Sequence, residues 1–96
     1  MADSSGAPSK IIVRKPTAEE ADEANKWGEW EKAPSTFAWS YSEKETCLIL
    51  EGSATVSADD GSQSAHFGSG DWVVFPVGLK CKWKIEKKIR KKYKFG

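Results

Sequence analysis

Trp39-Ser40-Tyr41-Ser42-Glu43-Lys44-Glu45 is followed by six residues and then by Gly52. Farther along the chain, Gly70-Asp71 is followed by four residues and then by Pro76-Val77-Gly78-Leu79-Lys80-Cys81. Aromatic side chains alternate with serines at the start of the first stretch, which is the pattern of a half-buried β-strand. Glycine and proline then mark turns at which strands end. We therefore expect both stretches to belong to a protein built of short strands.

Strand signals recur along most of the chain, with turn signals between them. Asp59-Asp60-Gly61 is one such signal and is typical of a tight hairpin. The expected strands cover residues 10–15, 37–42, 46–50, 54–57, 63–67, 72–75, 81–85 and 89–95. About eight short strands separated by turns indicate an all-β sandwich or barrel.

A short helix is expected near the N-terminus. Thr17 and Glu20 have the spacing of a capping box, in which each side chain bonds the backbone of the other, so a helix should run from about residue 18 to 24 or 25. Trp27 and Trp30 follow it. They could form a ligand-facing aromatic pair, but we favour packing of the N-terminal arm onto the barrel, because a tryptophan covers much apolar surface.

The two quoted stretches resemble the two conserved motifs of the cupin superfamily. The first motif reads His-x-His, three or four residues, Glu, six residues, Gly. The second reads Gly, five residues, Pro-x-Gly, two residues, His. Here the carboxylate and glycine framework is kept at Glu45, Gly52, Gly70 and Gly78, whereas the histidines are absent. The resemblance implies an RmlC-like fold.

Further stretches resemble the small single-domain cupins grouped with the cupin domain of (S)-ureidoglycine aminohydrolase. The shared features are the two tryptophans, Glu45-Thr46-Cys47, Gly70-Asp71, Phe75-Pro76-Val77-Gly78 and Lys80-Cys81-Lys82-Trp83. The match covers about residues 11–95. It implies a small cupin (jelly-roll) β-barrel with a short N-terminal helical arm, in which residues 10–96 form a single cupin domain and residues 1–9 a flexible tail.

The resemblance places four residues of this chain at the positions of the usual cupin metal ligands. Glu45 falls on the ligand glutamate, Cys81 on the second-motif histidine, and Trp39 and Tyr41 on the first-motif histidines. A typical cupin metal is held by three imidazoles and one carboxylate. The set here is incomplete, so we expect no cofactor; if a metal binds, Glu45 and Cys81 are its expected ligands, and Cys47 could add a thiolate.

Strand alternation also predicts which side chains face a pocket. Glu45 and Cys47 share one face of their strand, and the resemblance points that face into the barrel. Cys81 and Trp83 should face it from another strand, with Trp39 and Tyr41 at the mouth. His66 has the opposite parity to the apolar Phe67, so it should lie on the surface. The expected pocket is walled by aromatic side chains and suits small planar or cyclic molecules.

Within this pocket we assign roles by chemistry. Glu45 and Tyr41 are the candidate catalytic residues, because a carboxyl in an apolar barrel can serve as a general acid or base. The structural alternative is that Glu45 only bonds Tyr41 or a backbone amide. The candidate substrate-binding residues are Trp39, Cys47, Cys81 and Trp83.

Four functions remain open on the sequence. The first is metal-independent proton transfer of the isomerase, epimerase or cyclase type at Glu45. The second is metal-dependent hydrolysis related to (S)-ureidoglycine aminohydrolase, which the missing histidines oppose. The third is a non-catalytic metabolite-binding barrel. The fourth is a nucleic-acid-binding module with a basic tail. We favour a small-molecule-binding cupin of undetermined activity.

Charge is distributed unevenly along the 96 residues: the net charge is −7 over residues 1–79 and +8 over residues 80–96. Such polarity can mark a nucleic-acid or phosphate patch. However, Lys80, Lys82 and Lys84 alternate with apolar residues, as outward lysines on a terminal strand do, and such lysines protect a sheet edge. We therefore do not expect nucleic acid as a partner.

The remaining expectations concern location and assembly. No apolar run approaches the roughly 18 residues that cross a bilayer, and no signal peptide is recognisable at the start. The cytoplasm is therefore the expected location, and Cys47 and Cys81 should be reduced thiols. A homodimer is plausible, because cupins pair through barrel edges and the chain should expose a tryptophan-rich surface.

Overall fold

The computed structural model describes residues 10–96, so the expected tail at residues 1–9 lies outside the described residues. The described chain consists of strands and one short helix, which confirms the all-β prediction. In chain order the elements are β1 (Ile12–Arg14), α1 (Ala18–Ala24), β2 (Gly28–Lys32), β3 (Ser35–Ser40), β4 (Glu45–Ala58), β5 (Ser64–Gly68), β6 (Trp72–Phe75) and β7 (Lys80–Phe95).

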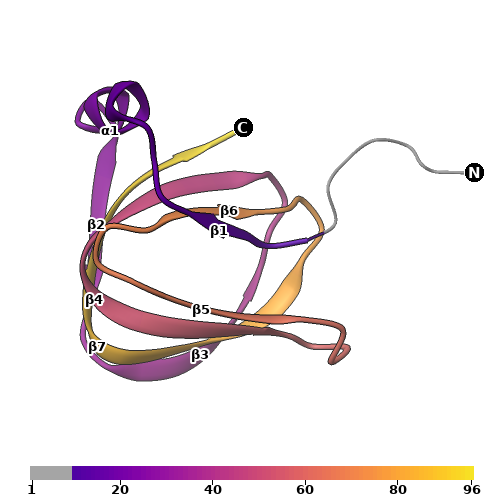
Figure 1. Ribbon diagram of the computed structural model, residues 1–96. Coiled ribbons are helices and arrows are strands. Elements are labelled where there is room, and N and C mark those ends of the chain that lie inside the picture. Colours follow the sequence, from indigo (N-terminus) through magenta and orange to yellow (C-terminus); the bar gives the residue numbers. More distant parts are fainter. Residues whose placement is uncertain (1–9) are drawn as a thin grey trace, which may run out of the picture.

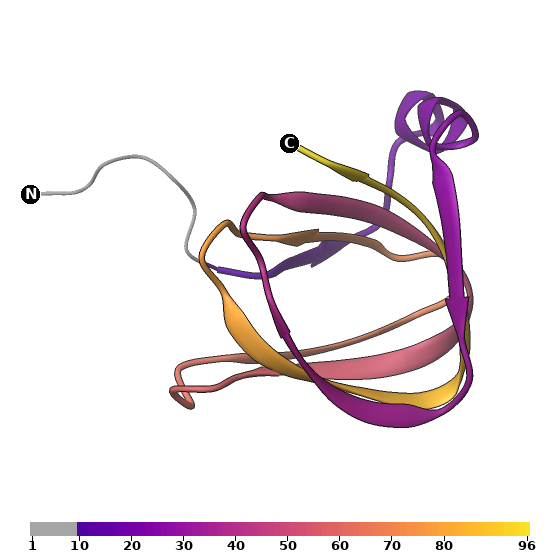
Figure 2. The same ribbon diagram turned by 180° about the vertical axis from the view of Figure 1, so that it is seen from behind.

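Two long strands, β4 and β7, organise the barrel. They pair with each other along most of their length, and both bend (Figure 1). The first and second halves of each strand are hydrogen-bonded to different neighbours. One half-sheet has the order β1-β6-β4-β7-β2, while the other halves of β4 and β7 pair with β5 and β3. Two half-sheets that share two bent strands enclose one interior, which Figure 2 shows from behind.

The continuity of these strands differs from the prediction. We expected separate strands at 46–50 and 54–57 and again at 81–85 and 89–95, but each pair forms one strand. The expected turn at Gly52 is instead a bulged bend, where the β4–β7 register shifts between Ile49 and Ala54. Gly52 has φ +89°, and a Cβ there would lie 2.0 Å from the carbonyl oxygen of Lys88. Only glycine fits this bend without displacing the backbone.

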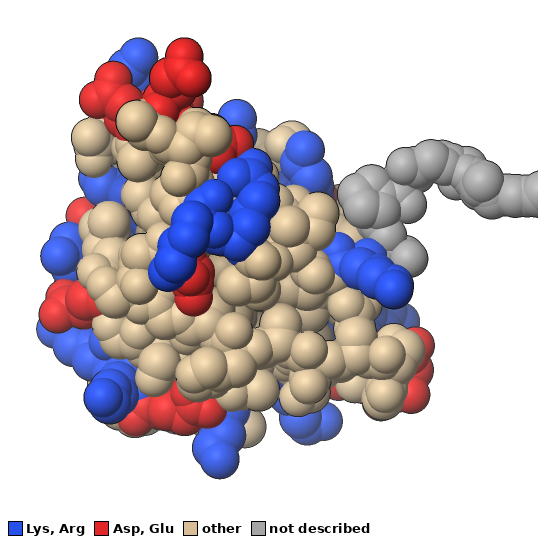
Figure 3. Space-filling model, viewed as in Figure 1, with Lys and Arg blue, Asp and Glu red and all other residues tan. Residues whose placement is uncertain are grey.

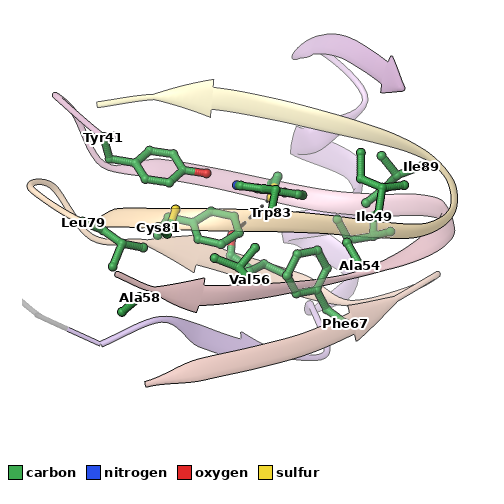
Figure 4. Packing of buried hydrophobic residues seen from close by; sticks show 14 residues of the cluster. Tyr41, Ile49, Ala54, Val56, Ala58, Phe67, Leu79, Cys81, Trp83 and Ile89 are labelled. Atoms are coloured by element: carbon green, nitrogen blue, oxygen red, sulfur yellow. Dashed lines mark hydrogen bonds between the residues drawn. The ribbon is translucent and has the colours of Figure 1, made fainter. Parts of the chain in front are cut away.

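The barrel interior is filled by alternating residues of β4 and β7. Cys81, Trp83 and Ile85 of β7 are at most 3% exposed, whereas the lysines between them are exposed. They meet Val56 of β4 and Phe67 of β5 in one cluster. Figure 4 shows Trp83, Val56 and Phe67 pointing into the same space. Burial of these apolar side chains is the main force that holds the barrel closed.

The helix lies against the outside of the barrel. The predicted capping box is present: the Thr17 side chain accepts a bond from the Glu20 amide, and the Glu20 carboxylate accepts one from the Thr17 amide. Trp27, which follows the helix, packs against Trp72 at a ring separation of 5.4 Å. Trp27 therefore fixes the arm as predicted.

Trp30 does not belong to the arm. It lies in β2, a strand that the sequence analysis missed, and β2 pairs with the second half of β7. Its ring lies 6.2 Å from that of Trp83, a core residue. The prediction that both tryptophans pack the arm is thus wrong for Trp30, because antiparallel pairing with β7 turns its side chain toward the interior.

Charged side chains of both signs lie on the outer surface (Figure 3). Figure 3 shows basic and acidic side chains interspersed on the side seen there. Several bases of β7 are paired: Lys88 with Glu31 at 3.4 Å, and Arg90 with Glu51 at 2.9 Å. His66 is exposed, as predicted, and its ring lies 3.1 Å from the Thr55 hydroxyl.

Two further expectations concern the surface. Within residues 10–96, no helix is long and apolar enough to cross a membrane. The expected tryptophan-rich surface is absent from this part of the chain: Trp39 is 48% exposed, whereas the other four tryptophans are buried or partly buried. The tryptophan-rich surface on which we based the homodimer is therefore not seen, and the homodimer itself stays a prediction.

Candidate active site

The barrel contains a cavity of about 230 Å³, which is lined mainly by residues of β3 and β7. Its walls are aromatic, as predicted, and its polar lining comes from three side chains. The lining residues are Trp30, Phe37, Trp39, Tyr41, Glu45, Trp83, Lys91, Tyr93 and Phe95. Ligand pockets for drug-sized molecules are usually about 300–1,000 Å³. This cavity therefore suits a smaller molecule.

Glu45, the first residue of β4, is the centre of the polar lining. It is 3% exposed and both of its oxygens have partners. The Tyr41 hydroxyl donates to Oε1 at 2.8 Å, and the Lys91 ammonium donates to Oε2 at 2.8 Å. A buried carboxylate is tolerated only when it is paired in this way. Tyr41, Glu45 and Lys91 thus form a hydrogen-bonded polar triad, the name we use below.

Lys91 is the unexpected member of the triad. It lies on β7, is 5% exposed, and its ammonium lies 4.8 Å from the ring centre of Trp30 and 4.6 Å from that of Trp83. The negative faces of aromatic rings attract a cation, and more strongly where water is excluded. Two rings and one carboxylate therefore hold the ammonium in place at the cavity wall.

Tyr41 connects the two sequence motifs. Its backbone N–H donates to the Leu79 carbonyl at 2.9 Å, and its carbonyl accepts from the Gly78 N–H at 2.7 Å. Its ring stacks on Phe75 at 5.1 Å. Burial, followed by the negative charge of Glu45, raises the pKa of Tyr41 well above its ordinary value. Tyr41 is therefore a neutral donor that orients Glu45, rather than a base.

The two cysteines lie in the core and do not line the cavity, although we expected them to contact a ligand. The Cys47 thiol donates to the Val73 carbonyl at 3.6 Å, and the Cys81 thiol donates to the Trp39 carbonyl at 3.6 Å. Both are free thiols, as predicted. Burial raises the pKa of Cys47 to about 12 and that of Cys81 to about 11. Such thiols are poor nucleophiles near neutral pH.

A family model described as the EutQ-like cupin domain matches residues 19–93 of the chain. This chain belongs to the EutQ-like cupin domain family. The cupin fold that the two motifs predicted is thereby confirmed. A comparison with curated proteins gave no match.

Solved structures agree with a small cupin. A DUF861 family protein from Thermotoga maritima is 42% identical, with 91% of this chain and 100% of that chain covered and a TM-score of 0.86. A putative ethanolamine utilization protein Q from Salmonella typhimurium is 18% identical, with 88% and 68% covered and a TM-score of 0.64. The EutQ protein of Clostridium difficile is 21% identical, with 86% and 64% covered and a TM-score of 0.62. These last two likenesses show the fold alone.

Cupins commonly bind a transition metal, so the donor set of this EutQ-like cupin can be tested for one. Within residues 10–96, no three His, Cys, Asp or Glu side chains are grouped as a metal site would require. Glu45 already accepts bonds from a hydroxyl and an ammonium, and Trp39 has no lone pair to donate. A cation adjacent to the carboxylate also repels a metal ion. The residues do not fit the usual cupin metal.

Part of the cavity of this cupin was predictable from the sequence. Glu45, Tyr41, Trp39 and Trp83 line it as expected. Lys91 was missed because Lys80, Lys82 and Lys84 were interpreted as outward, and no separate role was given to Lys91. Part of the missing signal lies in the alternation on β7: residues 81, 83 and 85 are buried, residue 87 is exposed at the bend, and residues 89 and 91 are buried again with the same parity. Trp30, Phe37, Tyr93 and Phe95 were missed because strand pairing brings them to the cavity.

Proposed function

We propose that this cupin binds a small planar or cyclic organic molecule in its aromatic cavity without using a metal. The observation that carries the proposal is the polar triad at the cavity wall. Seven aromatic side chains supply flat apolar contact, while Glu45 and Lys91 supply the few polar groups that orient a ligand. This combination of apolar walls and convergent polar groups is typical of a small-molecule site.

The triad also supports acid–base chemistry. Lys91 donates a hydrogen bond to Glu45 at 2.8 Å, so a proton can pass along that bond between ammonium and carboxylate. A paired acid and base of this kind can move a proton on a bound substrate, as isomerases, epimerases and cyclases require. Tyr41 holds Glu45 in position and is not itself the base.

A non-catalytic metabolite-binding module is the alternative, and the same cavity favours it equally. Metal-dependent hydrolysis of the (S)-ureidoglycine aminohydrolase kind is not proposed. That chemistry relies on a metal held by imidazoles, and here a lysine ammonium neutralises the carboxylate that would hold it.

The test begins with binding, followed by a search for turnover. Small aromatic and heterocyclic fragments are titrated into ¹⁵N-labelled protein, and the indole N–H signals of the tryptophans are followed. Fragments that shift Trp30, Trp39 and Trp83 more than Trp27, which lies outside the cavity, support the proposal. Shifts confined to Trp27, or none from any fragment, would contradict it.

The second step separates catalysis from binding. Glu45→Gln keeps the size of the side chain and removes its negative charge. Glu43→Gln is the matched control at an exposed position two residues before β4 begins. If a bound fragment is converted, Glu45→Gln should abolish conversion while Glu43→Gln retains it. Retained conversion in Glu45→Gln would refute proton transfer at this residue.

A further inference from the structure

Lys91 offers chemistry that the binding proposal does not use. It is a primary amine, it is 5% exposed, and what surface it has belongs to the cavity wall. Other bases of β7, such as Lys82 and Lys84, are exposed to solvent. A lysine in an apolar pocket is the usual arrangement for covalent catalysis on carbonyl compounds.

Resting on the proposed small-molecule site, we propose that Lys91 forms an imine with a planar aldehyde or ketone bound in the aromatic cavity. Three observations point to this substrate class. The amine lies at the cavity wall, an acid–base partner is 2.8 Å away, and the flanking rings of Trp30 and Trp83 provide a flat surface for a conjugated carbonyl compound.

Glu45 accepts and returns every proton that moves in the reaction. The Lys91 ammonium first gives one proton to Glu45, which frees the nitrogen lone pair. The nitrogen then attacks the carbonyl carbon, the C–N bond forms, and the carbonyl oxygen takes the proton back from Glu45. A second nitrogen proton moves to Glu45 and from there to the hydroxyl, which leaves as water while the C=N bond forms.

Charge is conserved through these steps. The site begins with an ammonium beside a carboxylate and ends with a protonated imine beside the same carboxylate. The only by-product is one water molecule, and no oxidant or reductant is needed. An ion pair between residues 91 and 45 is therefore present both before and after the imine forms. The two tryptophan rings can stabilise the cation in each state.

The experiment uses benzaldehyde as the probe and sodium cyanoborohydride as a trap, because hydride from the trap reduces a protonated imine to a stable secondary amine. Limiting benzaldehyde is added to the full chain, and the benzylated lysines are identified by peptide mapping. Orientation of the aldehyde in the cavity should label Lys91 at least about tenfold faster than Lys84, an exposed lysine of the same strand. Benzyl alcohol, which has the same ring and no carbonyl, should slow this labelling.

Two variants and a binding measurement make the outcome decisive. Lys91→Arg keeps a cation but cannot form an imine, so the fast label should vanish, whereas Lys84→Arg should leave it unchanged. Benzyl alcohol is also titrated alone against the indole signals. If it shifts Trp30 and Trp83 while Lys91 labels no faster than Lys84, the imine is refuted and the binding site stands. If neither the shifts nor the label appears, both proposals fail for this ligand class. The mapping on the unmodified sequence decides the matter even if Lys91→Arg does not fold.

Discussion

The Lys91 ammonium lies 2.8 Å from Oε2 of Glu45, with both side chains at most 6% exposed. Lys91 lies near the end of β7 and Glu45 is at the start of β4, so the contact joins two neighbouring, hydrogen-bonded strands on their inward face. It places a fixed cation beside the carboxylate at which a typical cupin would hold its metal.

The free energy of unfolding should reveal how strongly the pair is coupled. Glu45→Gln leaves a buried ammonium without its carboxylate, and Lys91→Met leaves a buried carboxylate with only the Tyr41 hydroxyl. Each change should cost about 3–5 kcal/mol, because a lone buried charge is expensive. The double variant contains neither charge and should lose clearly less than the sum of the two single variants. Urea denaturation measures all four proteins.

An exposed ion pair that joins the same two strands provides the control. Arg90 bonds Glu51 at 2.9 Å, with side chains 36% and 55% exposed. Glu51→Gln should cost about 1 kcal/mol or less, since water screens an exposed pair. Equal costs at Glu45 and Glu51, or strictly additive effects of Glu45→Gln and Lys91→Met, would show that the buried pair is not coupled as described.

The glycine of the first motif should be more sensitive than a turn glycine. Gly61 has φ +74° and open space around it, so Gly61→Ala should cost about 1–2 kcal/mol from its backbone conformation alone. Gly52→Ala has a similar φ and also places a Cβ 2.0 Å from the Lys88 carbonyl oxygen. That overlap should add about 1–3 kcal/mol. Thermal unfolding of both variants compares them, and a smaller loss at Gly52 would mean that the bend relaxes freely.

Most of the fold was predictable because its signals are local. Alternation at Phe37 and Trp39 and at Cys81 and Trp83 identified strands, and the Thr17–Glu20 spacing identified the helix. Strand continuity was not predictable: Gly52 looks like the end of a strand, whereas in the folded chain it is the point at which a single strand bends. The difference depends on a register shift against β7, which involves residues far away in the sequence.

The site residues that were predictable are mainly those that lie within the two sequence motifs. Glu45 and Tyr41 both lie within the first motif, and the connection between β3 and β4 brings their side chains within hydrogen-bond distance. Lys91 has no motif around it, and it is a residue type that normally faces water. Only the parity of its strand distinguishes it from neighbours such as Lys92. The place of Trp30 in the cavity was not predicted for a different reason: the pairing of β2 with β7 decides which way its side chain points.

Two cavity tryptophans should separate stability from ligand binding. Trp83 is 2% exposed and contacts several core rings, so Trp83→Ala should cost about 3–5 kcal/mol. Trp39 is 48% exposed at the rim and its ring meets that of Tyr41 in a T-shaped contact, so Trp39→Ala should cost about 1 kcal/mol or less. Affinity for benzyl alcohol should nevertheless fall in Trp39→Ala. Unchanged affinity in that variant would exclude the rim from the ligand site.

Alkaline pH should destabilise the protein through its buried thiols. The pKa of Cys47 rises from an ordinary 9.0 to about 12 because burial disfavours the thiolate. Between these two values the unfolded chain has lost the proton and the folded chain has kept it. Folding stability is therefore fully present below pH 9 and falls as the pH rises toward 12. Cys47→Ala removes this contribution, so its loss of stability between pH 8 and pH 10 should be about 1 kcal/mol smaller than that of the unsubstituted protein. Urea denaturation at both pH values gives the comparison. The difference between pH 8 and pH 10 is taken within each protein, so the constant cost of removing the sulfur cancels. Curves that fall in parallel would mean that the Cys47 thiol ionises as readily in the folded barrel as in the unfolded chain.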